Sequence, residues 1–213
     1  MRVKIASFLI IFSYLLHSYN PLKTSENCIF LYGGGYSGYW YTLSRLKKSF
    51  DRKNRFICYS SACVSLVHRL LNHDLKLAIL KSDKIQQQLI QKNSNLTEIR
   101  LKLIDTVMEG VTDKKIKISN YNFEILTTNK FGKCELMKPL GNVHLRKLLR
   151  ETTYVPGVTG NYDEQIENYD GGMCIGKPKC ETEINVPFDY LIWVKAFVHN
   201  LSIDDKNYFI SLD

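Results

Sequence analysis

The architecture of the chain is best inferred from one segment, Cys28-Ile29-Phe30-Leu31-Tyr32-Gly33-Gly34-Gly35-Tyr36-Ser37-Gly38. Its apolar half, residues 28–32, stops at three consecutive glycines, as a buried strand does where it enters a tight turn. The apolar residues that follow recur at spacings of four, three and four: Tyr39, Leu43, Leu46 and Phe50. This spacing puts them on one face of a helix. The segment therefore predicts a buried strand, a glycine turn and a helix.

The same pattern repeats directly downstream. Residues 56–59 predict a second buried strand. Val64, Val67 and Leu71 then repeat the helical spacing, so the small residues 60–62 fall at a strand-to-helix junction. Strands that alternate with helices favour a parallel sheet. The expected fold class is therefore α/β with a central, mostly parallel sheet.

Beyond residue 74 the sequence predicts helices that cover the sheet, a hairpin and an irregular segment over 152–170. The expected elements are two helices within 74–108 that are interrupted near 93–95, a strand over 116–127 that pairs with 134–137, a helix capped by Asn142 that runs to residue 150, and a closing helix near 190–200 with a strand near 208–212.

A length of 213 residues allows one domain with a sizeable core, and we expect that domain to cover residues 27–213. Residues 1–20 stand apart, because Arg2 and Lys4 precede an uncharged run over 5–16. This is the pattern of a secretory signal peptide or a short N-terminal anchor, and a buried first strand or helix is the alternative. The targeting interpretation predicts a protein of the secretory pathway that is secreted, luminal or membrane-anchored.

The six cysteines are compatible with an oxidising compartment but too sparse to replace a packed core. Cys174 and Cys180 bracket a short loop with Gly176 and Pro178, so they form either a small disulfide or two free thiols. A zinc site would need a second pair of ligands, and the five histidines show no metal-ligand spacing. We therefore expect no metal.

The chain has 29 Lys and Arg against 21 Asp and Glu, which gives a formal net charge of +8. An excess of this size either favours anionic membrane surfaces or is simply a solvated, lysine-rich exterior. No basic cluster is interleaved with aromatic residues, as binding to single-stranded nucleic acid requires. We expect no nucleic-acid partner, and the sequence predicts no particular oligomeric state.

The three glycines have a chemical interpretation as well as a structural one. Gly33, Gly34 and Gly35 lie between a strand and a helix, where backbone amides point outward and the helix dipole adds positive potential. Such amides suit a developing oxyanion. The spacing matches neither the Gly-x-Gly-x-x-Gly pattern nor the Gly-Lys-Ser/Thr ending of a phosphate-binding loop.

Two further segments would complete an ester hydrolase, which needs a hydroxyl nucleophile and a base beside those amides. Ser61 lies in Tyr59-Ser60-Ser61-Ala62-Cys63, at the strand-to-helix position of a Gly-x-Ser-x-Gly nucleophile elbow but without its glycines. Taken alone, a serine at this position is more often a helix N-cap than a nucleophile. Asp170-Gly171-Gly172 sets a carboxylate on a tight turn.

In motif and order, the glycine segment 33–38, the elbow serine and the Asp-Gly-Gly turn resemble the patatin-like phospholipase family. The segments over 125–128, 132–133, 145–149 and 152–157 also resemble the family's approach to its catalytic aspartate, so the resemblance covers about residues 28–172. Ser37 stands where many members have a basic residue, and Tyr59 and Cys63 replace the elbow glycines. These departures bear on catalytic rate rather than on fold.

The resemblance implies a three-layer α/β/α domain that cleaves carboxylic esters of lipids with a Ser/Asp dyad. It assigns the nucleophile to Ser61, the general base to Asp170, and the oxyanion donors to Gly33, Gly34 and Gly35. It implies a lipid ester substrate at a membrane surface and no metal or cofactor.

Two alternatives stay open at this stage. Ser61, Asp170 and His199 occur in the chain order of an α/β-hydrolase triad, although only one convincing strand precedes the elbow. A non-catalytic relative that binds lipid or membrane, with an elbow that cannot turn over substrate, is the second alternative. Loss of activity in His199→Ala would favour the triad, and liposome binding without ester turnover would favour the non-catalytic relative.

Overall fold

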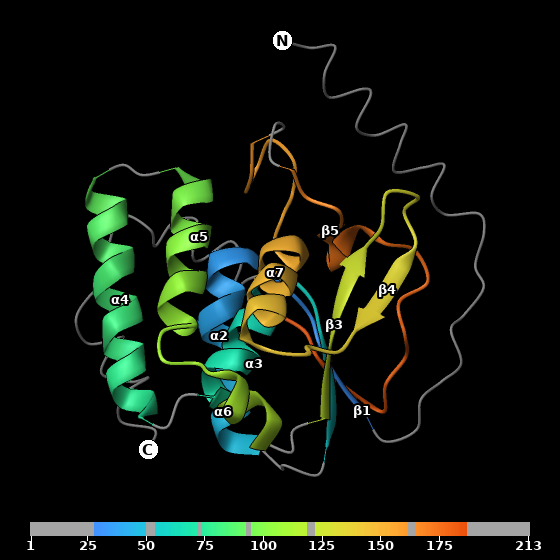
Figure 1. The fold of residues 1–213 in the computed structure, drawn as a ribbon, viewed down its shortest axis with the longest axis horizontal. Helices are drawn as coiled ribbons and strands as arrows, with labels where there is room; N and C mark the ends of the chain where they lie inside the picture. Colours follow the sequence, from blue (N-terminus) through green and yellow to red (C-terminus); the bar gives the residue numbers. More distant parts are fainter. Residues whose placement is uncertain are drawn as a thin grey trace.

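The computed structural model describes residues 28–49, 54–71, 74–92, 95–118, 122–161 and 165–186, and this part of the chain forms an α/β fold (Figure 1). Its sheet runs in the order β4-β3-β2-β1-β6, with β5 paired to β3. The strands are β1 (Cys28–Leu31), β2 (Arg55–Cys58), β3 (Asn122–Thr128), β4 (Cys134–Met137), β5 (Tyr169–Asp170) and β6 (Thr182–Ile184).

The sheet is mixed and mostly parallel. Strands β6, β1, β2 and β3 pair in parallel, while β4 and β5 run antiparallel to β3. Successive residues point to opposite faces, so Leu31 and Phe56 enter one apolar cluster while Phe30 and Ile57 enter another. The buried positions of β1 and of residues 56–58 on β2 explain why these stretches are apolar.

The helices gather on one side of the sheet (Figure 1), and each contributes side chains to the cluster on that face. They are α2 (Gly35–Ser49), α3 (Ser61–Leu71), α4 (Leu75–Gln91), α5 (Leu96–Val107), α6 (Asp113–Ile118) and α7 (Asn142–Thr152). The smaller cluster on the opposite face is covered by the segment that contains Cys174 and Cys180. No described helix is both long and apolar enough to cross a bilayer.

Most of the elements predicted from hydropathy are confirmed. The two strand-to-helix units, the interruption between α4 and α5 and the hairpin of β3 with β4 lie where the sequence predicted them. The strand β6 was not predicted, because three residues with two exposed side chains carry no hydropathy signal. The expected closing helix and strand, the leader over 1–20, Phe50 and His199 lie outside the described residues.

Two predictions about local structure are wrong. Residues 116–118 belong to the short helix α6 rather than to a strand, because the Thr112 hydroxyl accepts a hydrogen bond from the Lys115 amide and so caps that helix. Asn142 is not the cap of α7, since Gly141 occupies that position. The carboxylate of Asp113 instead accepts the Asn142 amide at 2.6 Å, so a different segment supplies the capping oxygen.

The cysteine pairing also differs from the sequence-based expectation. The six cysteines form three disulfides, Cys28–Cys180, Cys58–Cys63 and Cys134–Cys174, so Cys174 and Cys180 neither pair with each other nor remain free thiols. The reason is topological: β1 and β4 each bring a cysteine within reach of the segment that follows β5. That segment is therefore attached covalently to the sheet at two points.

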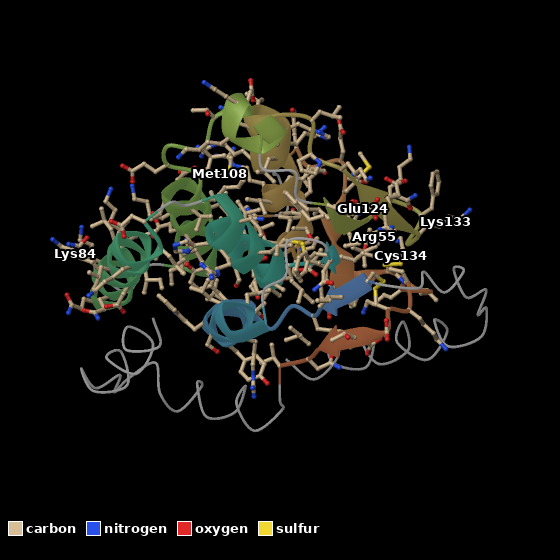
Figure 2. The ribbon with its side chains drawn as sticks, turned by 90° about the horizontal axis from the view of Figure 1, so that it is seen from below. Arg55, Lys84, Met108, Glu124, Lys133 and Cys134 are labelled. Atoms are coloured by element: carbon tan, nitrogen blue, oxygen red, sulfur yellow. A yellow bond between two sulfur atoms is a disulfide. The ribbon has the colours of Figure 1, made fainter. Side chains whose placement is uncertain are left out.

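Two polar contacts join neighbouring elements inside the fold. Arg55 on β2 pairs with Glu124 on the neighbouring strand β3, and the two labelled side chains lie together in Figure 2. On the helical side, the Tyr39 hydroxyl on α2 bonds to Nδ1 of His68 on α3. Both rings are fully buried, and Nε2 of His68 has no hydrogen-bond partner within the described part of the chain. Burial lowers the pKa of His68 to about 4.

This histidine predicts a loss of stability in acid. The unfolded chain protonates His68 near its ordinary pKa of 6.5, whereas the folded protein keeps it neutral down to about pH 4. The unfolded state thus binds more protons between these values, and stability falls as the pH falls from 6.5 towards 4, by roughly 3 kcal/mol. Urea unfolding of the wild type and His68→Gln at pH 7 and pH 4 should show this extra loss only in the wild type, and equal losses would contradict it.

Candidate active site

The three segments predicted to carry chemistry meet where β1, β2 and β5 end. Gly33 follows β1, Ser60 follows β2, and Asp170 closes β5, which pairs with β3. A Cβ atom added to Gly33 would lie 2.5 Å from the Cβ of Ser60, so only glycine permits this approach. The parallel pairing of β1 with β2 therefore brings the glycine turn and the elbow into direct contact.

Asp170 is a buried carboxylate with a small set of polar partners. Its side chain is part of a residue only 6 % exposed, and Oδ1 accepts the Gly172 amide at 2.7 Å. The Ser60 hydroxyl donates a second hydrogen bond to it. Burial is the main influence on its pKa and raises it to about 6, while these two donors and the charge of Lys177 oppose the rise. The group is thus poised to exchange a proton near neutral pH.

Ser60 is the one described non-glycine residue with positive φ, at 55°. This left-handed conformation is strained in an L-residue, and such strain persists only where neighbours hold it. The Ser60 amide donates to the Thr152 hydroxyl at 2.9 Å, and its carbonyl accepts the Cys63 amide at 3.1 Å. Thr152 in turn donates to the Leu126 carbonyl at 2.7 Å. Helix α7 and strand β3 thereby fix the turn that directs Ser60 to Asp170.

Ser61, the residue predicted as nucleophile, is placed differently. It is the first residue of α3 and is 7 % exposed. Its Oγ accepts the Gly34 amide at 3.2 Å, so it lies against the glycine turn. The hydroxyl paired with Asp170 is that of Ser60, one residue earlier. The structure thus brings Ser61 to the predicted oxyanion donors and Ser60 to the predicted base.

Tyr59, in the place of the first elbow glycine, covers the site. Its hydroxyl takes a hydrogen bond from the Gly33 amide, and burial, followed by the nearby charge of Asp170, raises its pKa. A Cβ on Gly171 would lie 2.7 Å from the Tyr59 Cβ, and one on Gly172 would lie 2.9 Å from the ring carbon Cε2, so this side chain fills the space between the glycine turn and the Asp-Gly-Gly turn. Two of the three glycine amides therefore already have hydroxyl partners.

Lys177 adds a positive charge that no sequence motif indicated. Its Nζ donates to the Gly172 carbonyl at 3.2 Å and lies 5.0 Å from the centroid of the Tyr59 ring. Burial lowers its pKa, and Asp170 works in the opposite direction. The lysine thus sits at the edge of the site, on the segment that the disulfides Cys134–Cys174 and Cys28–Cys180 attach to the sheet.

A disulfide spans the elbow itself. Cys58 ends β2 and Cys63 lies in the first turn of α3, so their bond encloses Ser60 and Ser61. Both cysteines are fully buried. Cys63 stands in the second elbow-glycine position, where its sulfur bonds back to the strand. The cross-link restricts the loop that carries both serines.

Comparison with known proteins does not assign the chain to a family. No protein-family model matches the chain, and no curated protein matches it. Within the described ranges, no group of three or more His, Cys, Asp or Glu side chains is arranged to hold a metal ion. A hydroxyl, a buried carboxylate and a glycine turn whose Gly33 and Gly34 amides bond to hydroxyl groups define a candidate nucleophilic centre.

The elbow disulfide should stabilise the fold less than the long-range one. Cross-linking residues five apart restricts a short loop and is worth roughly 2 kcal/mol, whereas the Cys28–Cys180 bond, with a separation of 152, is worth about 5 kcal/mol. Urea unfolding of Cys58→Ala/Cys63→Ala and of the matched variant Cys28→Ala/Cys180→Ala should show this order. Free thiols in the non-reduced wild type would contradict the pairing.

Proposed function

We propose that the protein is an acyl hydrolase that cleaves carboxylic esters of lipids through a serine ester intermediate. One observation carries the proposal: the Ser60 hydroxyl donates to the buried carboxylate of Asp170 directly beside the glycine turn. A nucleophile bonded to its base, near backbone donors, is the arrangement that acyl transfer requires. We assign the nucleophile to Ser60 rather than to Ser61, because the base contacts Ser60.

In the first step, Asp170 accepts the proton of Ser60 as its Oγ forms a bond to the ester carbonyl carbon. The tetrahedral oxyanion then collapses, the alcohol leaves with a proton from Asp170, and an acyl ester of Ser60 remains. In the second step, Asp170 takes a proton from water as the water oxygen attacks that ester. The carboxylic acid leaves and the Ser60 hydroxyl is restored, so no cofactor is consumed.

The oxyanion would be stabilised by the amides of Gly33, Gly34 and Gly35 at the start of α2. The hydroxyl of Tyr59 and the Oγ of Ser61 have to leave the first two amides before a substrate oxygen can use them. A donor of this kind is worth roughly 3 to 4 kcal/mol in related chemistry. The occupied amides therefore predict slow turnover unless substrate displaces both hydroxyls.

The resemblance to patatin-like phospholipases supports lipid esters as the substrate class, and the three-layer α/β/α arrangement belongs to the same proposal. Three disulfides support localisation in an oxidising compartment, in agreement with the secretory leader or anchor expected over residues 1–20. The charge of +8 supports a membrane surface rich in anionic lipid as the place where the ester is met.

A second candidate is a lipid-binding protein of the same fold without turnover. The contacts that favour it are those of Tyr59 and Ser61, which occupy the amides of Gly33 and Gly34. The two candidates differ in what Tyr59→Phe does. Removing the hydroxyl frees the Gly33 amide, which raises ester turnover in a hydrolase and has no effect in a protein that never forms the acyl ester.

Turnover of a soluble short-chain p-nitrophenyl ester tests the proposal. Ser60→Ala and Asp170→Asn should lower kcat/KM by about 100-fold or more, because each removes half of the nucleophile and base pair. Ser61→Ala is the matched control and should keep the activity or raise it, because it frees the Gly34 amide. Turnover should rise with pH through about 6, since Asp170 is a base only when ionised and its pKa is raised to about 6.

The opposite pattern, with an active Ser60→Ala and an inactive Ser61→Ala, would return the nucleophile to the residue predicted from the sequence motif. A wild type that is folded, as judged by circular dichroism, and inactive in both the native and the Tyr59→Phe forms would support the lipid-binding candidate instead.

A further inference from the structure

The turn that joins β3 to β4 exposes an aromatic side chain between two lysines. Phe131 is 75 % exposed, and Lys130 and Lys133 on either side of it are exposed as well. The Lys130 ammonium lies 5.2 Å from the centroid of the Phe131 ring. An aromatic ring flanked by lysines is the side-chain combination that anchors proteins at membrane interfaces.

The turn holds this ring outward by fixed contacts. The Asn129 side-chain oxygen accepts the amides of Phe131 and Lys133 at 2.9 and 3.1 Å, and its side-chain nitrogen donates to Glu135 at 2.8 Å. Gly132 supplies the left-handed φ of 75° that the turn requires. These contacts keep Phe131 exposed. The acidic side chain of Glu135 is bonded to Asn129.

The turn lies beside the candidate active site. Lys133 forms a parallel bridge with Ile175, and Cys134 is bonded to Cys174, so the segment after Asp170 runs along the turn. Met173, which is 47 % exposed, lies two residues before Ile175 on that segment, at the end of the 3-10 turn Gly171–Met173. The loop after α7 exposes a further apolar side chain, Val158, at 56 %.

The charge beside Phe131 is positive. Lys130, Lys133 and Lys177 come from the two joined segments, while Glu135 is held by Asn129. In Figure 2 the labelled Lys133 and Cys134 lie at one margin of the molecule, far from Lys84 on α4. Lysines around exposed apolar groups complement a surface that carries both anionic head groups and acyl chains.

We infer that the β3–β4 turn is a docking surface for anionic lipid bilayers, with Phe131 inserted at the interface and Lys130 and Lys133 against the head groups. The inference rests on the proposed function and deepens it, because the docked turn would hold the Ser60–Asp170 site close to the bilayer that contains the ester. It names the partner surface and leaves the chemistry of the site unchanged.

The test uses the full chain with Phe131→Trp, and Val143→Trp as the matched control, because Val143 is 80 % exposed on α7. Tryptophan emission is recorded with vesicles that contain brominated phosphatidylserine, and the wild-type signal from Trp40 and Trp193 is subtracted. Emission of Phe131→Trp should be quenched and emission of Val143→Trp should not. Lys130→Glu/Lys133→Glu should lower the affinity for these vesicles by about 10-fold or more.

Equal quenching at the two positions, or no quenching of Phe131→Trp, would overturn the inference. Equal affinity for vesicles of phosphatidylcholine alone would overturn the role of the lysines. Soluble ester turnover is measured on the same samples and should be the same in Lys130→Glu/Lys133→Glu as in the wild type. Quenching without any turnover would support docking while rejecting the hydrolase proposal, so the two failures are distinguishable.

Discussion

A carboxylate that is only 6 % exposed has lost most of its water, and Asp170 replaces that water with two hydrogen bonds and one nearby ammonium group. The Ser60 hydroxyl and the Gly172 amide are the donors, and Lys177 supplies the charge. A buried carboxylate without such partners would take up a proton. Asp170 therefore constrains three parts of the structure: the elbow that carries Ser60, the Asp-Gly-Gly turn, and the segment that carries Lys177.

Elements distant in sequence keep these partners in place. Thr152 on α7 fixes the strained backbone of Ser60, and the Cys58–Cys63 disulfide encloses the same turn. On the opposite side of the site, the Cys134–Cys174 disulfide attaches the segment that leads to Lys177. The elbow and the base depend on each other. The elbow holds the Ser60 hydroxyl against Asp170, and Asp170 keeps its raised pKa of about 6 only while the surrounding segments bury it.

Much of this could be predicted from local sequence. The glycine turn and both strand-to-helix units follow from short-range hydropathy, and Asp170 lies on a recognisable Asp-Gly-Gly turn. The choice between Ser60 and Ser61 could not be predicted, because it depends on where α3 begins and on a contact with Thr152, 92 residues away. The pairing of Cys28 with Cys180 has the same cause, since only the folded sheet brings these segments together. Local periodicity contains no information about such contacts.

The central claim, that Asp170 activates Ser60, is tested most directly by locating the adduct of a fluorophosphonate probe. The labelled protein is analysed by intact mass, and fragmentation of the elbow peptide separates the two adjacent serines. We predict one phosphonyl group on Ser60 Oγ and no label in Asp170→Asn. A label on Ser61, or a folded wild type that never reacts, would contradict it.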